Sequence, residues 1–303
     1  MLLIWLKTLI GLLLMLNFSL PLAAILSDGR LPEEPMPLLI LNMSLADYVF
    51  GSSLFAIGVA DLAYSGAAPR ALCAGLQYTI LGAALTAKAA NLLLAVDQFV
   101  GVVHCIRRGV IMHRWLGALL AACWSLLPLM WLLGAAAYHL GLETRAEFNQ
   151  RVFGVTPLEE CRWAVTAEAA LLTMETLLFL LTICSAALFI YTAVQGLQRE
   201  RLLAQAGEDA SASLFFLRFK SFKRIVKIVL SLLVLDIVGS AFRLSSLWSP
   251  MQLGMQVVHL TRMLSLLVEG WTYGLSYPVV REAVLTFFGR RSRHVAPLPR
   301  AWE

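Results

Sequence analysis

Seven long apolar segments restrict what this chain can fold into. Each is long enough to form a helix that crosses the hydrocarbon core of a bilayer, which takes about 20 mainly apolar residues. A helix also satisfies its backbone polar groups within one segment, as the bilayer interior requires. We therefore expect an all-α membrane protein, a bundle of seven transmembrane helices. The predicted spans are about 2–26, 37–62, 72–105, 114–138, 164–196, 219–247 and 256–279.

The composition agrees with a membrane bundle and excludes other classes. Of 303 residues, 59% are hydrophobic and 14% are charged, whereas soluble domains carry about 25% charged residues. The ten-residue alternating segments of an outer-membrane barrel are missing from the sequence. We predict one membrane domain over 1–289 and a short tail over 290–303, with no separate soluble domain. The net charge of +5 does not indicate nucleic-acid binding.

The distribution of lysine and arginine predicts the orientation of the bundle. The first, third and fifth connectors, the basic start of the sixth span and the C-terminal tail together hold sixteen lysines and arginines, and the opposite side holds six. Basic residues concentrate on the cytoplasmic side of membrane proteins. The pattern predicts an extracellular N-terminus, a cytoplasmic C-terminus and a multi-pass protein of the plasma membrane. Alternatively, the first segment is a cleaved signal peptide, which would leave six spans.

Two polar motifs fall in the second and third spans. The run LNMSLAD ends in Asp47, and AVDQFVGVVHCIRR contains Asp97, Gln98 and Phe99. In this order and spacing they resemble the motifs of rhodopsin-like (class A) G-protein-coupled receptors. The resemblance gives Asp47 the place of the family's sodium-linked aspartate. It also gives residues 97–99 the place of the DRY motif, although Gln98 replaces the arginine that engages the G protein.

The end of the seventh span extends the resemblance. EGWTYGLSYPVVREAVLTFF is similar to the family's NPxxY motif followed by a short amphipathic eighth helix. Tyr273 aligns with the motif tyrosine, while Glu269 and Gly270 replace the asparagine and the proline. The resemblance therefore implies an eighth helix over 280–289 that lies in the inner membrane interface. A simple continuation of the seventh helix is the alternative.

The resemblance also implies a disulfide. Cys73 precedes Asp97 by 24 residues, the interval that the family shows between its helix-three cysteine and its DRY aspartate. This interval corresponds to about 36 Å of helix, enough to cross the bilayer. Cys73 and Cys161 then both lie on the extracellular side, where a bridge between them is expected.

Lys88 is a cation inside the third span. Such a charge costs about 2.5–3.5 kcal/mol on insertion scales unless it is paired. Asp47 and Glu269 are the expected partners, because their family equivalents flank the same central cavity. On this hypothesis the ammonium takes the place of a sodium ion in a central polar network. Glu175 and Asp236 are alternative partners.

The sequence does not identify the ligand. The third-span position that holds an aspartate in amine receptors is Ile80, and the position of the opsin lysine is Met263, so the resemblance excludes both classes. Further polar side chains that could line a ligand cavity are Glu168, Glu175, Arg243, His259 and Arg262.

The resemblance implies a receptor that passes an extracellular signal to a heterotrimeric G protein or arrestin. Gln98 and the degraded helix-six and helix-seven motifs favour an alternative, a non-coupling relative that acts as a decoy, heteromer partner or trafficking protein. A transporter is a third hypothesis, although no internal repeat supports it. No catalytic motif is present, so we expect no enzyme, no metal site and no cofactor. Membrane lipids are the remaining expected partners.

Overall fold

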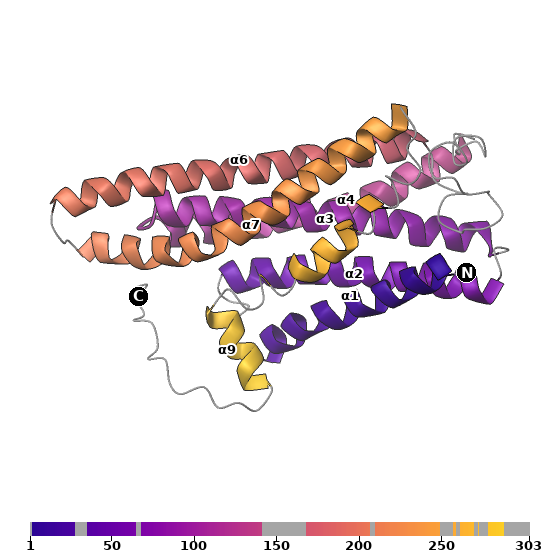
Figure 1. The fold of residues 1–303 in the computed structure, drawn as a ribbon, viewed down its shortest axis with the longest axis horizontal. Coiled ribbons are helices and arrows are strands. Elements are labelled where there is room, and N and C mark those ends of the chain that lie inside the picture. The colour runs from indigo at the N-terminus through magenta and orange to yellow at the C-terminus, as the bar shows by residue number, and fades with distance from the viewer. Residues whose placement is uncertain are drawn as a thin grey trace.

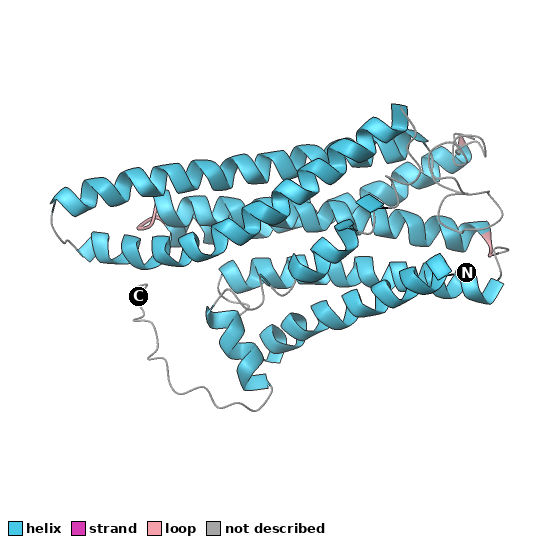
Figure 2. Cartoon of the chain, in the orientation of Figure 1, coloured by secondary structure: helices cyan, strands magenta, loops and turns pink. Residues whose placement is uncertain are grey.

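The structure of the chain is a computed structural model. It describes residues 2–27, 35–64, 68–140, 168–206, 210–248, 257–258, 261–269, 272 and 278–287. Throughout these ranges the regular structure is α-helix, and the rest is turn or loop (Figure 2). The expectation of an all-α protein is therefore confirmed.

Long helices that run along one common axis make up the bundle (Figure 1). A further stretch, 261–269, is helical and precedes the short helix α9. The helices are α1 (Leu2–Ser27), α2 (Pro35–Tyr64), α3 (Arg70–Val103), α4 (Arg108–His139), α6 (Glu168–Ala206), α7 (Ala210–Trp248) and α9 (Pro278–Phe287).

Six of these helices, α1 to α4, α6 and α7, are long and apolar enough to cross a membrane. They correspond to the first six predicted spans. Of the seventh predicted span, 256–279, the described parts 257–258, 261–269 and 272 are helical. We refer to the longest of them as the 261–269 helix.

The fifth connector differs from the prediction. The polar run 195–213 was expected to be a loop, but α6 continues to Ala206 and α7 begins at Ala210. Each of these helices has 39 residues, or about 58 Å at 1.5 Å per residue, against a hydrocarbon core of about 30 Å. Both extend beyond the other helices at one end of the bundle (Figure 1). Loss of hydropathy marks the edge of the membrane, and a helix can continue past that edge into water.

α3 lies at the centre of the bundle, and α4 lies at its periphery. In its most apolar window 78% of α3 is buried, compared with 17% of α4. α3 also contacts α2, α4, α6 and α7. A polar residue on α3 is therefore surrounded by protein, and this position brings Lys88 into contact with other helices.

α9 forms where the eighth helix is predicted, beginning at Pro278 and ending at Phe287. It packs on the end of α1 (Figure 1), where Val280 and Val284 join the same hydrophobic cluster as Ile25. Arg281 is exposed on the other side. The location of α9 in a membrane interface stays a prediction.

Candidate functional site

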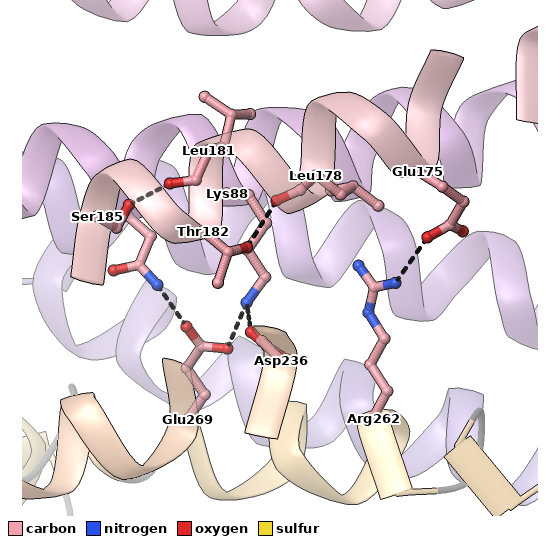
Figure 3. Close-up of polar contacts among 10 residues, drawn as sticks. Lys88, Glu175, Leu178, Leu181, Thr182, Ser185, Asp236, Arg262 and Glu269 are labelled. Carbon is pink, nitrogen blue, oxygen red and sulfur yellow. Dashed lines mark hydrogen bonds and ion pairs between the residues drawn. The ribbon is translucent and has the colours of Figure 1, made fainter. Parts of the chain in front are cut away.

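A buried ion-pair network occupies the middle of the bundle. Lys88 lies about midway along α3 and is 5% exposed. Its Nζ donates to Asp236 of α7 and, at 3.3 Å, to Oε2 of Glu269 in the 261–269 helix (Figure 3). Nδ2 of Asn91, one turn further along α3, donates to Oε1 of Glu269 at 2.9 Å. These contacts join three helices through one lysine.

The network differs in one member from the expected one. The structure brings Lys88 and Glu269 together, and the second carboxylate is Asp236, which the sequence offered as an alternative. Asp47 is buried in α2 at 3% exposure, but no ion pair joins it to Lys88 among the described residues. An isolated lysine is too costly in a membrane, so two carboxylates beside it stabilise its charge.

A second cluster of charges lies closer to the end of the bundle that contains Cys73, here called the Cys73 end. Glu175 of α6 forms an ion pair with Arg243 of α7, and its Oε2 lies 3.9 Å from Nη1 of Arg262 (Figure 3). The Glu175 side chain is 4% exposed. Three of the expected cavity residues, Glu175, Arg243 and Arg262, are therefore close to one another.

The remaining expected cavity residues do not join this cluster. Ile80 is 2% exposed and packs in a hydrophobic cluster with Met263. Glu168 begins α6, but its side chain lies outside the described part of the structure, as does His259.

The opposite end of the bundle, where α3 ends and α4 begins, is here called the basic end. There Asp97 is fully buried and accepts two hydrogen bonds from Arg108. Nε of Arg108 donates to Oδ1 at 2.9 Å, and Nη2 donates to Oδ2 at 2.6 Å. A bidentate pair of this kind is among the stronger ion pairs in proteins. The neighbouring Gln98 donates to Sδ of Met36, at 3.5 Å.

Arg108 was not among the predicted site residues. In the sequence it stood only as part of the basic third connector, although its spacing from Asp97 was visible there. Arg108 follows Asp97 by eleven residues, and the intervening turn at 104–107 reverses the chain. An arginine just after such a turn can reach an aspartate in the last turns of the preceding helix.

Phe99, the third residue of the DRY-like run, packs against two aromatic rings. Its ring lies 6.0 Å from His104 and 5.8 Å from Tyr191 of α6. This side of the motif therefore fastens α3 to α6.

A second arginine that the sequence analysis missed, Arg199 of α6, also reaches the end of α3. Its Nη1 donates to the carbonyl oxygen of Val103 at 2.9 Å, one of the carbonyls that a helix C-terminus leaves without an intrahelical partner. The Arg199 guanidinium lies 5.2 Å from the centre of the Phe215 ring. Arg199 thus links α3, α6 and α7 at the basic end.

The residues of the seventh-span motif are only partly described. Glu269 belongs to the central network, while Gly270 and Tyr273 lie outside the described residues. Cys73 is buried near the start of α3, and it is not among the free cysteines of the described residues. Cys161 also lies outside the described residues, so the Cys73–Cys161 pairing stays a prediction.

Comparison with known families settles the class of protein. Residues 19–266 match the family described as 7 transmembrane receptor (rhodopsin family). The chain belongs to this family. A search of curated proteins finds no match. Rhodopsin-family proteins are multi-pass membrane receptors and not enzymes, which agrees with the apolar helices described above.

Two polar contacts tie α4 of this rhodopsin-family receptor to α2 and α3. Nε1 of Trp124 donates to Oδ1 of Asn42 in α2 at 2.9 Å. Asp97 of α3, next to Gln98, is neutralised by Arg108 at the start of α4.

Proposed function

We propose that this rhodopsin-family receptor detects an extracellular ligand and transmits the signal to a cytoplasmic G protein or arrestin. Family membership over residues 19–266 is the observation that carries the proposal. The N-terminus and the Cys73 end then face the outside at the plasma membrane, and the basic end faces the cytoplasm. This orientation follows the excess of basic residues on one side.

The charge on the extended part of α7 supports the docking of a cytoplasmic partner. Lys220, Lys223 and Lys227 all have exposed side chains there. Stacked rings of Phe189, Phe222, Phe219 and Phe215 hold α7 against α6, with successive ring centres 5.4 to 6.3 Å apart. In this proposal the two helices present one basic surface to the transducer.

One specific observation favours a second candidate, a receptor relative that does not couple. Gln98 cannot supply the charged planar fork of donors that an arginine would offer to a G protein. Arg108 is engaged with Asp97 and Arg199 with the end of α3, so these two guanidiniums are already occupied. Such a protein would act as a decoy, heteromer partner or trafficking protein.

Constitutive G-protein recruitment distinguishes these candidates. We would compare wild type with Gln98→Arg at matched surface levels, and include Gln98→Lys to separate charge from the planar fork. We expect wild type to recruit a G protein above mock-transfected cells. Gln98→Arg is then expected to recruit more, because it restores a bidentate donor.

Recruitment by Gln98→Arg alone would contradict coupling by the wild-type chain and favour the second candidate. Recruitment by neither variant, with normal surface levels, would leave family membership as support for the fold alone. Arrestin recruitment measured in the same cells tests the other transducer.

We further propose that the central network replaces a sodium ion with the Lys88 ammonium. The ammonium lies between Asp236 and Glu269, which supports a built-in cation among the buried carboxylates. The network spans α3, α7 and the 261–269 helix, so a relative movement of these helices would separate its charges. A Cys73–Cys161 bridge over the bundle and a membrane-interface location for α9 complete the proposal.

A further inference from the structure

Two arginines converge on one carboxylate in the Cys73 half of the bundle. Arg243 comes from α7, Arg262 from the 261–269 helix, and Glu175 from α6. The side chains of the two arginines are 11% and 12% exposed. Both guanidiniums therefore face the same carboxylate.

The hydrogen-bonding capacity of Arg262 is unused within the described residues. Its closest carboxylate oxygen is 3.9 Å away, which is too long for a hydrogen bond. A guanidinium has five N–H donors and stays protonated. A charge with so little exposure is costly unless it is paired and hydrogen-bonded, so a ligand that accepts hydrogen bonds from these donors would be favoured.

We propose that Arg243 and Arg262 bind the carboxylate group of the extracellular ligand, and that Glu175 occupies their site when the ligand is absent. The planar fork of arginine matches a carboxylate in two parallel hydrogen bonds. This inference rests on the proposed receptor function and names its ligand class.

The same geometry would let the ligand change the contacts between helices. Glu175 ties α6 to α7 through Arg243 and lies beside Arg262 of the 261–269 helix. A ligand carboxylate that takes over Arg262 weakens the attraction between α6 and that helix. A ligand shifts a conformational equilibrium only through contacts that differ between two states, and this exchange of carboxylates is such a difference.

Thermal unfolding of the purified full chain in neutral-lipid nanodiscs tests the site. The probe is octanoate, octanamide is the uncharged control of equal length, and inorganic phosphate is the second anion. Octanoate is expected to raise the unfolding midpoint of wild type in a saturable way, since a ligand stabilises the state that binds it. Glu175→Gln removes the internal competitor and is expected to increase apparent octanoate affinity about tenfold.

Arg262→Gln is expected to abolish the octanoate response, while Arg281→Gln, an exposed arginine on α9, leaves it unchanged. A response confined to Glu175→Gln, and lost on adding Arg262→Gln, also supports the site. The proposal is overturned if octanoate acts no better than octanamide on both wild type and Glu175→Gln. An equal response to phosphate would overturn the carboxylate assignment. Because no G protein is present, failure here is distinct from failure to couple.

Discussion

At the scale of single residues, Lys88 is the side chain on which the central ion-pair network depends. Lys88→Met leaves Asp236 and Glu269 buried without their shared cation. Removing one partner of a buried ion pair costs about 3–5 kcal/mol, because the remaining charge is uncompensated. We therefore expect Lys88→Met to lower the thermal unfolding midpoint and the surface expression. Adding Asp236→Asn and Glu269→Gln is expected to restore part of both.

Lys223 provides the matched control for this experiment. It pairs with Glu200 at 2.8 Å, but the two side chains are 44% and 32% exposed. An exposed ion pair contributes about 0–1 kcal/mol, so Lys223→Met should leave the midpoint nearly unchanged. If Lys88→Met instead improved surface expression and left signalling unchanged, the central network would have no role.

The partners of Lys88 were only partly predictable from the sequence. It indicated that Lys88 needs an acidic partner, since burial of a lone cation is costly, and it named Glu269. It could not choose between Asp47 and Asp236, because that choice depends on how α2 and α7 are rotated about their axes. Helices that are apolar nearly all round carry no strong stripe to fix this rotation.

At the scale of helices, close backbone contacts at glycine hold α1 against α2. A Cβ on Gly11 would lie 2.6 Å from the backbone nitrogen of Phe55, so the helices themselves would have to move. Small residues permit this kind of approach between membrane helices. Gly11→Leu is expected to destabilise the protein by about 1–3 kcal/mol through overpacking, measured as a lower unfolding midpoint.

Gly117 in α4 is the control for Gly11, because nothing lies within 4 Å of an added Cβ there. Gly117→Leu should be neutral or slightly stabilising, since leucine favours helix over glycine by roughly 0.5–1 kcal/mol. Equal effects of the two substitutions would show that the α1–α2 contact is looser than the structure indicates.

The lengths of the helices were the least predictable feature at this scale. Hydropathy located the six spans, because apolar length is what the bilayer selects. It placed the end of α6 near 196, although that helix continues to Ala206. Polar residues such as Gln, Glu and Arg are good helix formers in water, so composition alone could not separate this extension from a loop.

At the scale of the whole molecule, α1 is an integral part of the bundle and should remain in the mature protein. Leu14 and Phe18 are fully buried, and Nδ2 of Asn17 donates to the carbonyl oxygen of Leu267 at 3.1 Å. Loss of α1 would expose these apolar contacts and the partly covered 261–269 helix. This burial argues against the cleaved signal peptide that the sequence left open.

Epitope tags at the two termini test both the retention of α1 and the orientation of the bundle. We expect an antibody to reach an N-terminal tag on intact cells and a C-terminal tag only after permeabilisation, because basic residues hold the opposite end in the cytoplasm. A tag of the same sequence on a known cytoplasmic protein controls for leaky cells. Loss of the N-terminal tag from the mature protein, with the C-terminal tag retained, would mean that the first segment is cleaved. An N-terminal tag detected only after permeabilisation would reverse the orientation, and the Arg243–Arg262 cluster would then face the wrong side for an extracellular ligand.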